Sequence, residues 1–129
     1  MLYVMRYAGT MALRTRPTDC CPTVQSPQEL TAPIRDRLVA MYRALGDATR
    51  FEIFRLIVAQ IDPICVCDVV DRFAFTQPTI SYHLKLLRQA GLVTVSQRGV
   101  WAYYAVDPEG LRLLQDNIAF PLARVGAPA

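Results

Sequence analysis

The residues best suited to chemistry in this 129-residue chain are its four cysteines, which form two close pairs. Cys20 is followed directly by Cys21, and a single residue separates Cys65 from Cys67. Thiolates bind soft or borderline metal ions, and neighbouring thiols can also be oxidised to a disulfide. The two pairs therefore predict either a site for a thiophilic ion or a redox-active site.

The spacing of Cys65 and Cys67 limits what this pair can do alone. Two residues apart, side chains on a regular helix point about 200° away from each other, and on a strand they point to opposite faces. Both can bind one ion only if the backbone is irregular there, as it can be just after Pro63. Otherwise one cysteine is the main ligand. Because the pair supplies only two thiolates, the site also needs further ligands.

The composition indicates one globular domain that hides some apolar surface, for example in a dimer interface. The chain is 53% hydrophobic and 19% charged, and 14 basic against 11 acidic residues give a net charge of +3. This balance excludes a disordered chain. No apolar run approaches the roughly 18 residues of a membrane span, and the start lacks a secretory pattern. We therefore expect a cytoplasmic protein without structural disulfides. Met1, Met5 and Met11 are the candidate start residues.

A change in character near residue 30 divides the chain. Pro17, Pro22 and Pro27 interrupt any helix, so residues 1–30 are predicted to be a flexible arm that carries Cys20 and Cys21. Residues 31–129 are predicted to be a folded domain. The expected helices cover 31–45, 47–58, about 65–73, 76–90 and a segment from 107, and the expected strands cover 92–97 and 100–106.

Local signals mark the ends and the inner faces of these helices. Thr31, Asp47 and Thr76 are suitable N-caps, and Gly91 is well placed to follow the end of its helix. The second helix carries a broad apolar stripe, which we expect to be core. This stripe consists of Phe51, Ile53, Phe54, Ile57 and Val58.

The order of elements is that of a winged helix-turn-helix domain, mainly α with a β-hairpin wing that turns through Arg98 and Gly99. A recognition helix presents polar groups from its N-terminal end to the major groove. The helix over 76–90 leaves such groups on its outer surface, and the basic ones can contact phosphates. The predicted DNA contacts are Gln77, Thr79, Ser81, Tyr82, His83, Lys85, Arg88 and, at the tip of the wing, Arg98.

No enzymatic role is predicted. A Cys/His nucleophile pair would need His83 near a thiol, but the helical pattern places His83 outward on the DNA-reading helix. The sequence also contains no phosphate-binding loop and no evident carboxylate pair.

Three segments together resemble the ArsR/SmtB family of metal-sensing bacterial repressors. They are YRALGDATRFEIFRL at 42–56, TQPTISYHLKLLRQAGL at 76–92 and RGVWAYYAV at 98–106. The resemblance covers about residues 34–115. It implies a homodimeric winged-helix repressor that binds a palindromic operator and releases it on binding metal or metalloid, with the first and last helices forming the interface. Tyr82 stands where many relatives have histidine or arginine.

The segment ICVCDV at 64–69 resembles the metal-binding box of the family. Some arsenic-responsive relatives add a third cysteine three positions after the second, where this chain has Val70. Relatives with N-terminal cysteines bring them to the helix cysteines of the other subunit, which makes Cys20 and Cys21 the expected replacements. Three thiolates suit As(III) or Sb(III), the inducers that we favour.

Two alternatives keep the same fold and change the signal. Four thiolates would suit Cd, Pb or Zn, and oxidation of the cysteines would make a thiol-redox sensor. The family's other sensor position, on the last helix, uses histidine and carboxylates. That helix has no histidine here, and Asp107, Glu109 and Asp116 alone would bind zinc poorly, so we expect no sensing through it.

Overall fold

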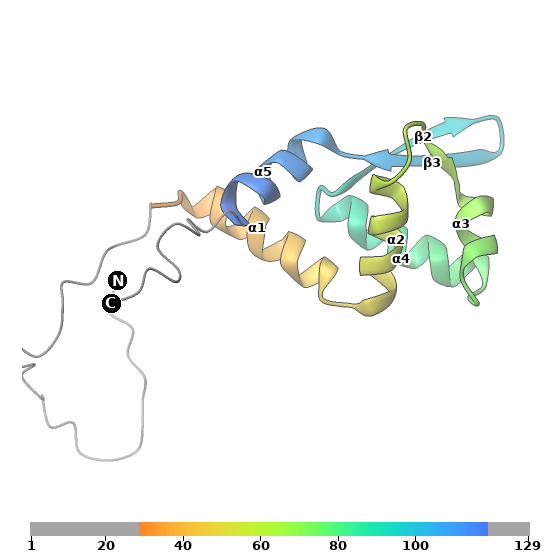
Figure 1. Cartoon of the computed structure of the whole chain (residues 1–129), viewed down its shortest axis with the longest axis horizontal. Coiled ribbons are helices and arrows are strands. Elements are labelled where there is room, and N and C mark those ends of the chain that lie inside the picture. Colours follow the sequence, from red (N-terminus) through yellow and green to blue (C-terminus); the bar gives the residue numbers. More distant parts are fainter. Residues whose placement is uncertain (1–28, 119–129) are drawn as a thin grey trace, which may run out of the picture.

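The computed structural model describes residues 29–118, so Cys20 and Cys21 lie outside the described residues. The described part contains five helices and three short strands, in an order that confirms the predicted winged helix-turn-helix (Figure 1). The elements are α1 (Ala32–Leu45), α2 (Ala48–Val58), β1 (Ile64–Cys65), α3 (Val66–Arg72), α4 (Gln77–Gln89), β2 (Val93–Arg98), β3 (Trp101–Val106) and α5 (Pro108–Ile118).

The helices begin and end where local backbone chemistry requires. The Asp47 carboxylate accepts a hydrogen bond from the backbone N–H of Arg50, 3.0 Å away, and so caps α2. Thr31 and Thr76 occupy N-cap positions without a side-chain capping bond, and each is followed by a proline in the first turn. After α4, Gly91 has a φ of 78°, the left-handed conformation that glycine adopts most readily.

The capping bond makes the stability contribution of Asp47 depend on pH. The backbone N–H of Arg50, and then the charges of Arg50 and His83, lower the pKa of Asp47 from 3.8. Its contribution is therefore complete above pH 3.8 and is lost as the pH falls through the folded pKa. We expect Asp47→Ala to lower Tm at pH 7 and to differ less from the native chain at about pH 2.5.

The uncharged variant Asp47→Asn is the control, because asparagine can also accept the capping bond. Its Tm at pH 7 should lie between those of the native chain and Asp47→Ala. Thermal melts of the three proteins at both pH values test this, and a gap between native and Asp47→Ala that is equal at both would contradict it.

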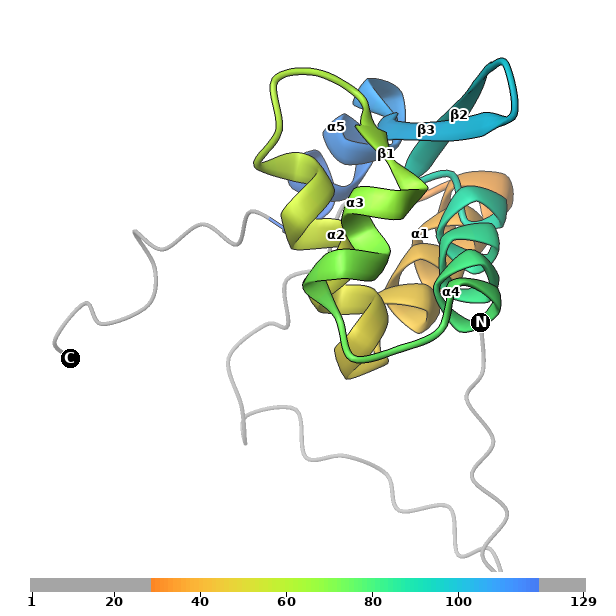
Figure 2. The same cartoon turned by 90° about the vertical axis from the view of Figure 1, so that its right-hand side faces the viewer.

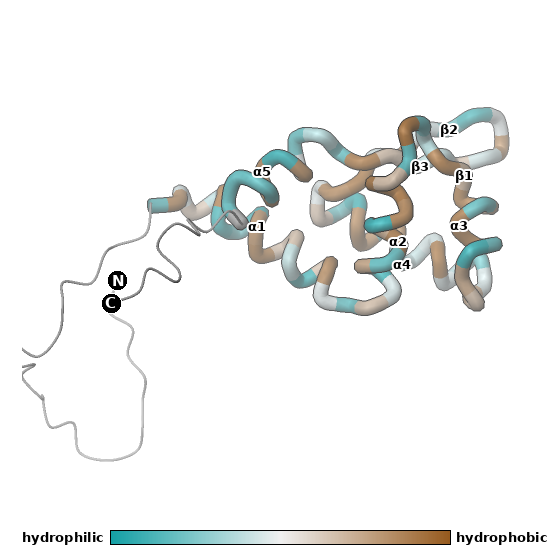
Figure 3. The backbone as a smooth tube through the Cα atoms, in the orientation of Figure 1, coloured by the Kyte–Doolittle hydropathy of each residue, from teal (hydrophilic) through white to brown (hydrophobic). Residues whose placement is uncertain are grey.

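The core forms where the five helices and the sheet meet. Each fully buried aliphatic side chain contributes about 1.5–3 kcal/mol through loss of apolar surface to water. Figure 3 shows hydrophobic residues recurring at intervals along the helices. The most deeply buried are Met41, Ile53, Ile57, Val69, Ile80, Leu84, Leu87, Leu92 and Val93.

The expectation that the whole apolar stripe of α2 is core was wrong at two positions. Phe51 is 46% exposed and Val58 is 38% exposed, whereas Ile53, Phe54 and Ile57 are buried. At about 100° per residue, Phe51 and Val58 lie roughly 90–110° from the centre of the buried arc. They flank the core and face outward.

The sheet has one strand more than the expected hairpin. β3 pairs antiparallel with β2 on one side and with β1 on the other, where Ile64 lies opposite Tyr104 and Cys65 opposite Tyr103. α3 therefore begins one residue later than predicted, at Val66, and Cys65 is both the end of a strand and the N-cap of a helix.

The turn of the wing is also shifted by one residue. Arg98 lies opposite Trp101 as the last pair of the ladder, so the loop is Gly99 and Val100 rather than Arg98 and Gly99. Gly99 has a φ of 63°, as expected at the first central position of a two-residue hairpin loop.

The described part is elongated, with different elements at its two ends (Figures 1 and 2). α3 and the wing lie at one end, and α1 and α5 lie side by side at the other.

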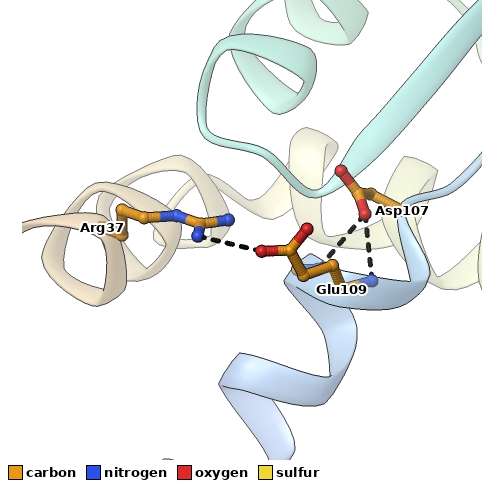
Figure 4. A network of polar contacts seen from close by, with 4 residues as sticks. Arg37, Asp107 and Glu109 are labelled. Atoms are coloured by element: carbon orange, nitrogen blue, oxygen red, sulfur yellow. Dashed lines mark hydrogen bonds and ion pairs between the residues drawn. The ribbon is translucent and has the colours of Figure 1, made fainter. Parts of the chain in front are cut away.

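In Figure 4 the Asp107 carboxylate accepts hydrogen bonds from the backbone N–H groups of Glu109 (3.0 Å) and Gly110 (3.3 Å), and Arg37 of α1 pairs with Glu109 (3.4 Å). Among the described helices, none combines the length and apolar character needed to cross a membrane.

Candidate functional site

The Cys65 and Cys67 side chains come together, which answers the question raised by their spacing. Cys65 has extended backbone angles (φ −64°, ψ 143°) because it pairs with β3, and helical geometry begins only at Val66. This change of conformation within three residues brings the Cα atoms within 5.2 Å of each other. The two sulfurs are joined as a disulfide, whereas a chain without structural disulfides was expected. The irregular backbone that joint action of the pair requires is therefore present.

The pair is tied to the start of α3 and is only partly open to solvent. Cys65 is 5% exposed, and its Sγ accepts the backbone N–H of Cys67 at 3.4 Å. Cys67 is half-buried. In the reduced form, two sulfurs held this close provide two of the ligands that a soft ion requires.

The described residues do not complete a metal site around this pair. Within 29–118, no group of three or more histidine, cysteine or carboxylate side chains is arranged to hold a metal ion. At the start of α5, Asp107 is occupied in capping and Glu109 in pairing with Arg37. A third thiolate would have to come from residues outside the described range, where Cys20 and Cys21 lie.

A groove of ≈ 680 Å³ lies beside the pair, between the end of α2 and α3. Ile64 and Asp68, the neighbours of the two cysteines, line it, but neither cysteine does. The groove is therefore separate from the thiol pair.

α3 packs directly on α4, so a change at the cysteines can reach the helix expected to read DNA (Figure 2). Val66 and Val69 of α3 belong to the same buried cluster as Ile80 and Leu84 of α4. Because such packing is dense and deforms little, displacement of the N-terminus of α3 has to be accommodated by α4.

The outer face of α4 carries most of the residues predicted to contact DNA. Gln77, Tyr82, Lys85 and Arg88 are exposed, Tyr82 by 57%. Thr79 and Ser81 are half-buried on the flanks. The structure thus places an amide, a phenol and two cations on one accessible surface, which fits a major groove and its phosphates.

His83 lies differently from the outward position expected for it. It is half-buried, and its Nδ1 lies 3.4 Å from Nη1 of Arg50 on α2. The rings of Phe75 and Tyr82 lie 6.4 and 5.8 Å away, centroid to centroid. Sequence reasoning missed Arg50, since no local pattern reveals a contact between residues 33 positions apart.

Arg98 belongs to the last pair of the wing ladder and is exposed there. Its guanidinium carbon lies 4.5 Å from the centroid of the Tyr103 ring, a cation–π contact on the same sheet. This contact orients the side chain along the wing, from where it remains a predicted DNA contact.

Replacing Lys85 by alanine should weaken DNA binding, and the loss of affinity should be about the same for DNA duplexes of different sequence. A lysine that contacts phosphate releases a counterion, so its loss reduces the slope of log K against log salt by about 0.9 per contact. Arg55→Ala removes the same charge from the exposed surface of α2, where Arg55 pairs with Glu52 at 3.2 Å, and should leave the slope unchanged. Anisotropy titrations at several salt concentrations test this, and equal slopes for the native chain and Lys85→Ala would contradict it.

The chain is similar to known bacterial and archaeal regulators. The profile of the arsR family of bacterial regulatory proteins matches residues 47–95, from the N-cap of α2 into β2. An uncharacterised HTH-type transcriptional regulator of Methanocaldococcus jannaschii is 40% identical over 56% of this chain and 81% of its own length.

Two further relatives are resistance regulators. The arsenical resistance operon repressor of Bacillus subtilis is 41% identical over 53% of this chain, which spans 64% of the length of that protein. The homologue of the cadmium resistance regulatory protein CadC in Staphylococcus aureus is 32% identical, over 60% of this chain and 63% of that protein.

A solved structure has the same fold. It is the homodimeric winged helix-turn-helix domain of a possible ArsR-family regulator from Mycobacterium bovis, with a TM-score of 0.58 and 23% identity, and it covers 75% of this chain and 87% of that one.

Proposed function

We propose, since the chain belongs to the ArsR family of bacterial regulatory proteins, that it is a homodimeric repressor released from operator DNA by As(III) or Sb(III). As a member of that family it is a DNA-binding transcriptional regulator and not an enzyme, as the sequence predicts. One observation carries the proposed response: the Cys65 and Cys67 sulfurs meet at the N-terminus of α3, which packs on α4.

The proposed ligand set joins this pair to the predicted arm. Cys65 and Cys67 provide two thiolates, and Cys20 or Cys21 of the other subunit provides the third. Trivalent arsenic and antimony are thiophilic and suit three sulfur ligands, which is why a pair with one added thiolate favours them over ions that prefer four. The arsenical resistance repressor among the relatives supports this choice.

The proposed dimer uses the end of the molecule away from the wing. α1 leaves Ile34, Val39 and Tyr42 at least 36% exposed, although it lies within the fold against α2, α4 and α5. Covering these side chains with a second copy would remove apolar surface from water. The structural neighbour is described as homodimeric, which supports a dimer.

The proposed switch needs only a modest energetic coupling. Ligand binding displaces the start of α3, the packed α4 moves with it, and the spacing of the two recognition helices changes. A coupling of about 1–3 kcal/mol reduces DNA affinity by roughly 5–150-fold. Because the ligand must favour the low-affinity state, tight binding alone would not release DNA.

Fluorescence anisotropy tests the proposal directly. The reduced native chain is titrated onto a labelled duplex that it has selected from a random-sequence pool, and arsenite, antimonite, cadmium or lead is then added. Release by arsenite or antimonite at concentrations well below those of the other ions is expected. Release by cadmium or lead without release by arsenite would replace the metalloid with the four-thiolate alternative, which the cadmium-resistance relative favours.

A redox response is the second candidate, and the disulfide between Cys65 and Cys67 favours it. Two thiols and one hydrogen peroxide would give one disulfide and two waters, the peroxide being reduced as the sulfurs are oxidised. If peroxide releases DNA in metal-free buffer, and dithiothreitol restores binding, the signal is oxidation. Absence of peroxide release excludes oxidation and leaves a metalloid or metal ion as the signal.

A further inference from the structure

Arg50, on α2, contacts α1 and α4 through one side chain. Its Nε donates to the backbone carbonyl of Ala44 at the end of α1, at 2.7 Å. Its backbone N–H is bound by Asp47, the cap of α2. Its Nη1 lies 3.4 Å from Nδ1 of His83 on α4. The guanidinium is half-buried, so these contacts are partly protected from water.

The contact with His83 fixes the proton on the imidazole ring. A guanidinium can only donate hydrogen bonds and stays charged at all ordinary pH values. Nδ1 of His83 must therefore accept, which places the proton of the neutral ring on Nε2. In the described part of the chain, Nε2 has no hydrogen-bond partner, so this N–H remains available to an acceptor outside the protein.

The groups around the ring favour holding it in this form. Arg50 and Asp47 face it from α2, Tyr82 from α4 and Phe75 from the connection between α3 and α4. The two aromatic rings lie beside the imidazole, and Arg50 selects the nitrogen that accepts. His83 lies on the flank of α4 and not on its most exposed line. The flanks of a recognition helix face the phosphates, whereas its most exposed line faces the base edges.

We propose that Arg50 is a positioning residue for DNA recognition, which holds His83 in the Nε2–H form so that the ring donates to a phosphate oxygen. The inference rests on the proposed function for its DNA step, but the state of the ring is tested without DNA. Arg50 acts through His83 and does not itself contact DNA.

Nitrogen-15 NMR of the histidine-labelled native chain tests the first step, since the chain has one histidine and hence one pair of ring signals. At neutral pH, the expected result is a protonated Nε2 and an unprotonated Nδ1. Arg50→Lys, whose single ammonium group can keep the shorter bond to Ala44 but not also the one to His83, and Arg50→Gln should move the ring toward a mixture of tautomers. Arg55→Gln, on the exposed face of the same helix, should leave the signals unchanged. A native ring protonated on Nδ1, or a ring unaffected by both Arg50 variants, would overturn the proposal.

A double-mutant cycle tests the DNA step. Arg50→Lys and His83→Ala should each weaken binding to the selected duplex about fivefold, the loss expected for one hydrogen bond, and equally on altered sequences. In the His83→Ala background, Arg50→Lys should have no further effect. A full effect there would mean that Arg50 contacts DNA itself or only supports the fold, and would overturn its positioning role.

The two levels of failure are distinguishable. A native chain that binds no duplex refutes the proposed function together with the DNA step. A native chain that binds DNA, with Arg50→Lys still weakening binding in the His83→Ala background, refutes the positioning role alone. Circular dichroism and Tm of each variant show that it is folded, and Arg50→Lys provides the measurement if Arg50→Gln unfolds.

Discussion

A chain in which serine replaces Cys67 is expected to bind its operator normally and to stay bound when arsenite is added. Cys67 lies half-buried in the first turn of α3, away from the outer face of α4, so the exchange of sulfur for oxygen leaves the DNA-reading residues in place. A serine hydroxyl remains protonated at neutral pH and does not replace a thiolate. In the native chain, arsenite is expected to reduce DNA affinity by roughly 5–150-fold. In Cys67→Ser, arsenite should leave the DNA affinity almost unchanged.

Cys65→Ser separates ligand loss from helix damage. Cys65 is the N-cap of α3 and its Sγ accepts the backbone N–H of Cys67, a task that serine performs well at helix N-termini. The variant should therefore fold and bind DNA, yet not respond. Cys20→Ser and Cys21→Ser made singly should retain part of the response if three thiolates suffice, and together should abolish it. Normal arsenite release by Cys65→Ser and Cys67→Ser, measured by the same anisotropy titration, would refute the proposed site.

Sequence reasoning succeeded where the determining interaction is local. Asp47 caps α2 through a residue three positions away, and Gly91 adopts the left-handed conformation that ends α4. Prolines in the first turns of α1 and α4 fix where those helices start. Such effects depend on a few consecutive residues, so their pattern is visible in the sequence.

The geometry of the thiol pair depended on a contact that no local pattern contains. β1 consists only of Ile64 and Cys65, and its partners Tyr103 and Tyr104 follow about 40 residues later. Two residues are too few to show a periodicity, yet their pairing extends Cys65 and thereby brings its sulfur to that of Cys67. The spacing alone shows that both cysteines can bind one ion only if the backbone is irregular. It does not show whether the backbone is irregular there.

The exposure of some apolar residues and the burial of some polar ones could not be predicted for a related reason. Phe51 and Val58 are hydrophobic and stand near the core face, but hydrophobicity does not say whether the same chain or another covers them. His83 looks like a fully outward residue until its half-burial and its contact with Arg50 are known. The partner of His83 lies on another helix, and the exposure of Phe51 and Val58 depends on how the whole domain packs, so only the three-dimensional structure shows either.

Gly110→Ala is expected to destabilise the fold strongly, even though alanine is the better helix former. Gly110 is buried in the first turns of α5, where an added Cβ would overlap the backbone carbonyl oxygen of Gly91 and lie 3.4 Å from Cε of Met41. Gly91 cannot move aside easily, because its left-handed conformation ends α4 and leads directly into β2. Instead α5 has to move away, weakening its contact with α1.

The expected cost is about 3 kcal/mol, at the upper end for overpacking, which would lower Tm by roughly 10–20 °C for a domain of this size. Gly46→Ala is the matched control. Gly46 is exposed with a φ of −73°, and its added Cβ would come no closer than 3.4 Å to any atom, so Tm should stay the same or rise slightly. Thermal unfolding of the three proteins tests this, and a Gly110→Ala chain as stable as the native one would show that α5 is not held against Gly91.

Since α5 lies beside α1, at the end proposed for dimerisation, sedimentation of Gly110→Ala should also show a larger monomer fraction than Gly46→Ala.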